Sequence, residues 1–196
     1  MEHFELGIAV QKVYDFIWDE FCDWYIEMVK PRLYSKEETD DQCKNAALWT
    51  LKNVLIQALK LLHPYMPFIT EEIFCTLQSE EESIMVSAWP VHREEWEFAR
   101  EEEAIELMKE AVRGIRNVRT QMNVAPSRKA AVFVVSDKEE VRKVFAEGKL
   151  FFASLAGASE VTVQADRSGI ADDAVSVVIP NAVLYIPFAE LVDIAQ

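Results

Sequence analysis

Residues 61–74 read Leu-Leu-His-Pro-Tyr-Met-Pro-Phe-Ile-Thr-Glu-Glu-Ile-Phe, and the two prolines in this stretch separate two helices. Pro64 has no backbone N–H and disfavours the α conformation at His63, so we expect one helix to end there. Pro67 suits the first position of a second helix, where a missing N–H costs no hydrogen bond. By itself this spacing predicts only a helix corner. We expect four apolar residues to pack at the corner: Leu62, Phe68, Ile69 and Ile73.

Apolar residues spaced by three or four on both sides of the corner predict four helices with short connections, which is typical of an antiparallel bundle. We expect these helices at residues 4–29, 41–62, 67–78 and 94–122. Pro31 is expected to end the first helix. The polar residues 35–41 are expected to form a loop, and residues 84–90 a short extended piece.

The composition changes after Pro126, where short β-rich runs alternate with helical patterns. We expect strands at 132–135, 161–163, 175–179 and 183–186, helices at 137–146 and 150–156, and a turn at Asn181. The tail 188–196 is expected to begin a further helix. The predicted class is therefore mainly α, with an antiparallel helical bundle over 1–124 and a small α/β subdomain over 127–196.

The net charge of −14 on 196 residues argues against general nucleic-acid binding, but the charge is unevenly distributed. Residues 1–104 carry a net charge of −13 and residues 105–196 a net charge of −1. Within residues 109–129, six basic residues accompany a single acidic residue, Glu110. A local surface for an anionic partner is therefore possible on this segment. We expect neither DNA nor a membrane as a partner.

The sequence contains no self-contained active site. A glycine-rich phosphate loop, a nucleophile elbow and a zinc-protease motif are all missing from the 196 residues. Cys22, Cys43 and Cys75 are widely spaced and form no C-x-x-C, so we expect reduced thiols and no metal site. No leader pattern and no membrane-length apolar stretch occurs, and we expect a cytoplasmic protein.

The best binding candidates follow the fourth predicted helix. Lys109, Arg113 and Arg116 share one helix face, and Arg119 lies at its shoulder. Arginine can contact phosphate or stack on a base, and amides can read base edges. The full candidate set is Lys109, Arg113, Arg116, Asn117, Arg119, Arg128 and Lys129. The alternative is a solvated helix face with ordinary i, i+3 ion pairs, and the pattern alone favours this interpretation.

Aromatic residues of the first predicted helix offer a second possibility. Trp18, Phe21, Trp24 and Tyr25 could stack unpaired bases. Residues at this helical spacing are more often part of a core. Both interpretations stay open at this point.

Longer strings resemble a known family. Residues 13–27 read Val-Tyr-Asp-Phe-Ile-Trp-Asp-Glu-Phe-Cys-Asp-Trp-Tyr-Ile-Glu, and residues 30–33 read Lys-Pro-Arg-Leu. Together with residues 61–74 and the Trp-Pro that ends residues 84–90, they closely resemble the bacterial valyl-tRNA synthetases, a family of class I aminoacyl-tRNA synthetases. The Phe-Cys-Asp-Trp-Tyr-Ile-Glu string favours this family over its isoleucyl and leucyl relatives. The resemblance covers essentially the whole chain.

The resemblance implies an anticodon-binding helical bundle followed by the α/β connector that leads to a C-terminal coiled-coil arm. Valine tRNA and the catalytic core of the same polypeptide are the implied partners. The complete enzyme is expected to use ATP and Mg²⁺, and to edit mischarged threonyl-tRNA in a separate domain. Strings like His-Ile-Gly-His and Lys-Met-Ser-Lys-Ser are missing here, so we expect no cofactor within these residues. The alternative is a module that docks on the catalytic core without contacting RNA.

Overall fold

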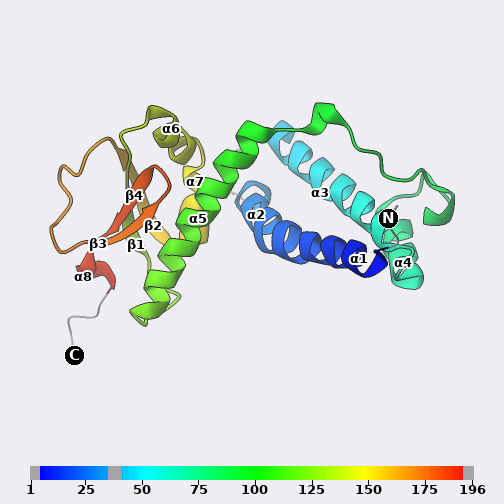
Figure 1. Ribbon diagram of the computed structural model, residues 1–196, viewed down its shortest axis with the longest axis horizontal. Helices are drawn as coiled ribbons and strands as arrows, with labels where there is room; N and C mark the ends of the chain where they lie inside the picture. Colours follow the sequence, from blue (N-terminus) through cyan, green and yellow to red (C-terminus); the bar gives the residue numbers. More distant parts are fainter. Residues whose placement is uncertain (1–4, 35–40, 192–196) are drawn as a thin grey trace. The chain divides into compact units, whose positions relative to one another are not determined.

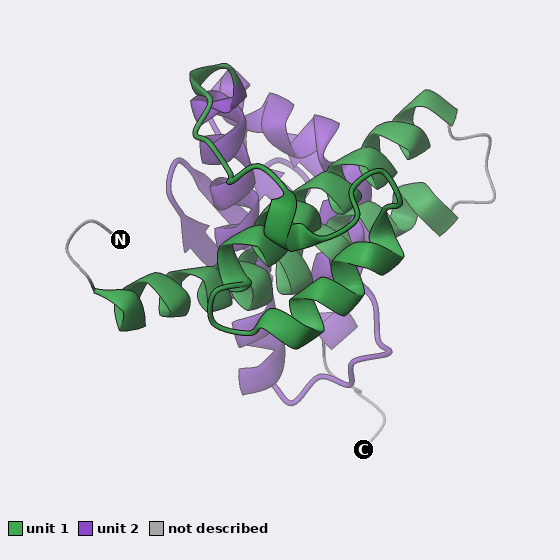
Figure 2. Ribbon diagram, turned by 90° about the vertical axis from the view of Figure 1, so that its right-hand side faces the viewer, with its two compact units in different colours: residues 1–95 green, residues 96–196 purple. Residues whose placement is uncertain are grey.

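The computed structural model describes residues 5–34 and 41–191, which form two compact units. The first unit is Met1–Glu95 and the second is Trp96–Gln196 (Figure 1, Figure 2). The predicted boundary lay between residues 124 and 127, so the division made by the structure differs by one helix. The long helix α5 (Ala99–Gln121) belongs to the second unit because its buried side packs against the α/β elements there.

The first unit begins with one continuous helical segment. It consists of α1 (Leu6–Asp15), the π-helical stretch η1 (Phe16–Ile26) and α2 (Glu27–Tyr34). The expectation that Pro31 ends this helix is wrong, because the helix continues through it to Tyr34. Pro31 lies in the last turn, where the loss of its N–H interrupts the helix only near its end. The predicted loop at 35–41 lies largely outside the described residues.

The helix α3 (Asp41–Leu62) contacts both α1 and α2, and then meets α4 (Pro67–Leu77) at the predicted corner. The backbone N–H of His63 donates to the carbonyl of Leu59 at 2.8 Å, and Pro67 takes the first position of α4. The two helix boundaries predicted from the prolines are therefore confirmed.

The packing of this corner differs from the prediction. Leu59, Phe74 and Ile84 form its buried centre, with five further side chains around or beside it. These are Leu55, Ile56, Thr70, Ile73 and Leu77. Phe68 is 90% exposed and Ile69 is also exposed, so their assignment to the packing is wrong. The inner face of α4 is defined at helical spacing by Thr70, Ile73, Phe74 and Leu77. Phe68 and Ile69 do not lie on this face.

A short 3-10 turn, η2 (Ile84–Val86), follows α4, where a brief extended piece had been expected. The hydroxyl oxygen of Ser83 accepts a hydrogen bond from the backbone N–H of Met85 at 3.0 Å and caps this turn. A second 3-10 turn, η3 (Glu94–Trp96), precedes α5, so the helix predicted from residue 94 begins at Ala99.

The second unit is built on a four-stranded mixed sheet in the order β2-β1-β4-β3. The strand β1 (Ala130–Val135) pairs in parallel with β2 (Ala158–Gln164) and antiparallel with β4 (Ala182–Ile186), which pairs antiparallel with β3 (Val175–Ile179). The parallel pair is joined by α6 (Glu139–Glu147) and α7 (Lys149–Ala156), and α8 (Phe188–Leu191) follows β4. The predicted fold class, a set of helices followed by a small α/β part, is confirmed. Asn181 has a φ of 61° in the two-residue turn before β4, as expected of a turn residue.

Alternate residues of the strands are buried beneath the helices. In β1 these are Ala130, Val132 and Val134, as the two-residue period of a strand requires. The helix α5 contacts β3 and α7 of this unit. Gly114 lies at a close approach, because a Cβ atom added there would overlap Cγ1 of Val177 on β3. A glycine at this position therefore allows α5 to lie close to the sheet.

Candidate nucleic-acid interface

The charge of α5 changes sign along its length. Its first turn carries Glu101 and Glu102, and no acidic residue follows Glu110 before the helix ends at Gln121. Three arginines occupy that second half. Because the carbonyl groups at a helix C-terminus carry partial negative charge, cations are stabilised there. The candidate surface therefore begins after Glu110.

Four residues of this basic half share one exposed face. Arg113, Arg116, Asn117 and Thr120 follow the i, i+3, i+4, i+7 spacing of neighbours on a helix, and all four are exposed. We call them, together with Lys129, the α5 basic surface. Thr120 was not among the predicted candidates, although its spacing of seven residues from Arg113 would have identified it.

Arg116 also binds the end of a neighbouring helix. Its Nε donates a hydrogen bond to the carbonyl oxygen of Leu155 at 3.1 Å. Leu155 lies in the last turn of α7, where the carbonyl groups have no partner within the helix. The contact fixes the guanidinium of Arg116 through its Nε, while the residue as a whole stays exposed.

Arg119 is buried and binds the backbone of the segment that follows α5. It is only 9% exposed, and its Nη2 donates to the carbonyl oxygens of Ala125, at 3.3 Å, and of Arg128. Its own carbonyl oxygen accepts from the N–H of Val124 at 2.9 Å. A Cβ atom added at Gly157, whose φ is 65°, would lie 3.6 Å from Cζ of Arg119. The arginine therefore holds the segment after α5 against the end of that helix, and RNA cannot reach most of it.

The remaining three cations also differ in how far they are exposed to solvent. Lys109 is 1% exposed and forms an ion pair with Glu106, so it does not contribute to an open surface. Lys129 is exposed, and Arg128 is half-buried. Because Arg119 binds the carbonyl of Arg128, the backbone of this segment returns to the end of α5. The structure thus brings five predicted candidates to the end of α5 and keeps two of the seven buried.

Arg113 is the cation of this surface that lies nearest the acidic half. Its Nη1 lies 4.0 Å from Oε2 of Glu106, and about half of its side chain is exposed. An exposed ion pair of this length contributes little to stability. The contact with Glu106 is therefore one that costs little to exchange for a contact with an anionic partner.

The aromatic candidates of the first unit also differ in their exposure to solvent. Phe21 and Trp24 are buried and belong to the packing of the unit. Trp18 is 52% exposed, and its ring lies 6.2 Å from that of the exposed Tyr14. Tyr25 is half-buried and stacks on Phe21. Of the four predicted stacking residues, Trp18 is the most accessible.

Among residues 5–34 and 41–191, no cluster of three or more His, Cys, Asp or Glu side chains is arranged to hold a metal ion. In the same described residues, no helix combines the length and the apolar character that crossing a membrane requires. The chemistry available at the α5 basic surface is therefore charge and hydrogen bonding: guanidinium and ammonium groups for phosphate, with an amide beside them. The hydroxyl of Thr120 already donates to the carbonyl oxygen of Arg116 at 2.9 Å.

Comparison with known proteins gives a consistent result. A family model described as the anticodon-binding domain of tRNA ligase matches residues 1–134. The chain is 47% identical to a valine–tRNA ligase of Clostridium tetani, 44% identical to one of Clostridium acetobutylicum and 35% identical to one of Carboxydothermus hydrogenoformans. Each alignment covers 100% of this chain and 22% of the relative. The chain thus spans less than a quarter of the length of these relatives.

Proposed function

Because the chain belongs to the family of anticodon-binding domains of tRNA ligases, we propose that it is the tRNA-binding part of a valine–tRNA ligase. In this role it would hold the anticodon region of valine tRNA in the cytoplasm while the complete enzyme joins valine to that tRNA. The matched residues 1–134 include all of α5 and the segment that follows it.

The observation that carries this proposal is the α5 basic surface. Arg113 and Arg116 are exposed on the same face, with Asn117 beside them and Lys129 after the helix. Guanidinium groups bind phosphate in a forked geometry, and an amide can pair with a base edge. The acidic first half of α5 would repel a phosphate backbone, so the proposed footprint is limited to the second half and its continuation.

We assign the ATP and Mg²⁺ of the ligation reaction to parts of the complete enzyme outside these residues. The chain has five glycines and no glycine-rich loop of the kind that cradles phosphates. Within the proposed function, its residues bind and orient tRNA and take no part in bond formation.

A binding measurement at two salt concentrations tests the proposal. Fluorescently labelled valine tRNA and a transcript with an altered anticodon are titrated with the 196-residue chain at about 50 and about 200 mM salt. We expect tighter binding to valine tRNA, with an affinity that falls as salt rises because phosphate contacts release counterions. Equal affinity for both transcripts, or no binding at the lower salt concentration, would contradict the proposed function.

Exposed aromatic residues of the first unit favour a second candidate function. Tyr14 and Trp18 form a ring pair on the surface, and no residue of α1 is buried. Exposed apolar patches of this kind often mark protein contacts. Under this alternative the first unit docks on the catalytic core without contacting RNA. Replacing Trp18 with Ala in a complete ligase would then weaken aminoacylation while leaving the affinity for tRNA unchanged; loss of tRNA affinity would exclude this alternative.

A further inference from the structure

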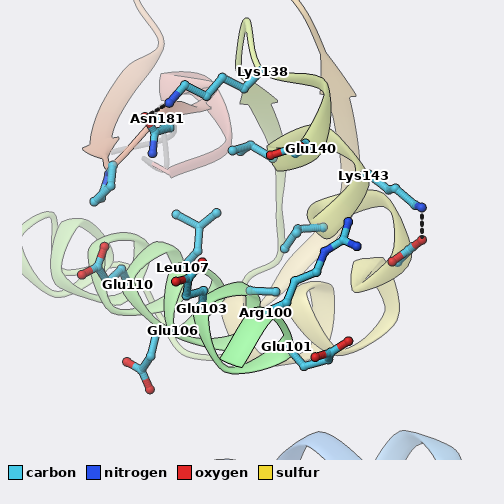
Figure 3. A pocket seen from close by; sticks show the side chains of 15 residues that line it. Arg100, Glu101, Glu103, Glu106, Leu107, Glu110, Lys138, Glu140, Lys143 and Asn181 are labelled. Carbon is cyan, nitrogen blue, oxygen red and sulfur yellow. Dashed lines mark hydrogen bonds and ion pairs between the residues drawn. The ribbon is translucent and has the colours of Figure 1, made fainter. Parts of the chain in front are cut away.

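A groove lies between the first half of α5 and the helix α6 within the second unit (Figure 3). It has a volume of about 630 Å³. Its apolar floor comes from both helices: Ala104, Leu107, Val141 and Val144. In Figure 3, Leu107 points from α5 toward α6, across the open space. The groove therefore offers an apolar strip between two helical walls.

The rim of the groove is strongly acidic. Six glutamates and three cations line it. Lys138 donates to Oδ1 of Asn181 at 2.6 Å, and Lys143 lies 3.6 Å from a carboxylate oxygen of Glu147. Lys143 is thus paired with a carboxylate, whereas Lys138 binds a neutral amide and keeps its charge, and Arg100 is the third cation. The lining as a whole still carries three more carboxylates than cations.

Four carboxylates of the rim remain without such partners. Within the part of the chain that the structure describes, no hydrogen bond or ion pair involves their side chains. They are Glu101, Glu103, Glu110 and Glu140. Unpaired like charges around one opening raise the local negative potential, which attracts cations and repels phosphate.

We propose that this groove docks a basic amphipathic helix of a partner protein. The apolar face of that helix would lie on Leu107 and Val144, and its lysine or arginine side chains would reach the unpaired carboxylates. Laying an amphipathic helix into an apolar groove is a general mode of peptide recognition. Charge complementarity specifies a basic helix, and it excludes RNA from this half of α5. The inference goes beyond tRNA binding, because it concerns the opposite end of the helix.

The probe is a fluorescein-labelled peptide of about 18 residues, with leucines at i, i+3, i+4 and i+7 spacing and lysines elsewhere. Fluorescence anisotropy reports its binding to the 196-residue chain. A scrambled peptide of the same composition lacks the apolar face and serves as the peptide control. We expect the scrambled peptide to bind about tenfold more weakly, because it cannot fill the floor of the groove.

The groove variant carries Glu103→Gln, Glu110→Gln and Glu140→Gln. A charge-matched variant carries Glu80→Gln, Glu82→Gln and Glu160→Gln, which are exposed positions that do not line the groove. We expect the groove variant to weaken binding about tenfold and the matched variant less than about twofold.

Three outcomes would overturn the proposal. If the two triple variants weaken binding equally, the peptide is attracted to the acidic protein as a whole. If the scrambled peptide binds with the same affinity, the apolar floor of the groove does not contribute to recognition. Sedimentation of the chain alone would detect the third outcome, a dimer that dissociates in the groove variant. In that case a second copy occupies the groove.

Discussion

Nε of Arg116 donates a hydrogen bond to the carbonyl oxygen of Leu155 at 3.1 Å, joining α5 to the end of α7 across 39 residues of sequence. One turn later, Arg119 sits beside Gly157, the left-handed residue that ends α7. Two arginines of one helix therefore meet the C-terminus of another, where partial negative charge favours them. Arg119 is buried in this contact, whereas Arg116 stabilises the unit and keeps an exposed side chain on the α5 basic surface.

Arg113→Ala is expected to weaken binding of valine tRNA several-fold. The loss of one phosphate contact also lowers the slope of log affinity against log salt by about 0.7–0.9. The matched control is Arg100→Ala, which removes the same charge from the acidic end of the same helix. Titrations at four salt concentrations compare the two. If both variants lose affinity equally, the effect is one of net charge, and the α5 basic surface is not the RNA contact.

Arg119→Met is expected to lower the unfolding free energy of the second unit by about 2–4 kcal/mol, because it leaves the carbonyls of Ala125 and Arg128 without their donor. Arg113→Met removes an exposed arginine from the same helix and should change stability by less than about 0.5 kcal/mol. Hydrogen exchange of the β1 and β4 amides measures the stability of the second unit in both variants. Tryptophan fluorescence would report mainly on the first unit, because four of the five tryptophans lie there. Equal exchange rates in the two variants would refute a structural role for Arg119.

Gly114→Ala is expected to destabilise the second unit by about 1–2 kcal/mol. Alanine is the better helix former by about 1 kcal/mol, but its Cβ would overlap Cγ1 of Val177. The same amide exchange measurement applies. Combining Gly114→Ala with Val177→Ala should cost less than the sum of the two single changes, because the second change removes the atom that clashes. Simple additivity would indicate that α5 does not approach β3 at this point.

Cys75 is expected to react slowly with iodoacetamide. Desolvation of its sulfur and the hydrogen bond it donates to Glu71 raise the pKa of the Cys75 thiol, and the charges of Glu71 and Glu72 act in the same direction. A raised pKa lowers the fraction of reactive thiolate at any pH below it. Glu71→Gln should bring the pKa down, so alkylation at about pH 8 should become faster.

Peptide mapping by mass spectrometry follows each cysteine separately. The exposed Cys43 serves as the internal reference, and its rate should be unchanged in the Glu71→Gln variant. A Cys75 rate that does not respond to this change would show that the Glu71 carboxylate does not control the thiol.

The helix boundaries were largely predictable because their causes are local. The corner at Pro64 and Pro67 and the turn at Asn181 follow from the backbone preferences of single residues. The family assignment drawn from residues 13–27 and 61–74 is confirmed by the domain match over residues 1–134 together with the 35–47% identity to valine–tRNA ligases. Pro31 is an exception, since a proline in a final turn costs too little to end a helix that is otherwise packed.

The candidate site was predictable only in part. Helical spacing showed that Arg113 and Arg116 share a face, and both are exposed. The same spacing gave no sign that Lys109 would be buried or that Arg119 would bind two backbone carbonyls. The partners of Arg116 and Arg119 lie in other segments, as do the groove walls, and no local pattern records which segments meet.

By itself, the sequence determined the positions of most helices and strands, the helix corner at residues 61–74, the class of the fold and the family. These depend on backbone restrictions and on periodic apolar residues, which act over a few positions. Tertiary structure alone decided that α5 packs with the sheet and which of its cations face solvent. Burial depends on which elements meet after folding: Gly114 lets α5 approach Val177, and the segment beyond Gln121 returns to Arg119. The corner at residues 61–74 is thus a local property, whereas the α5 basic surface exists only in the folded unit.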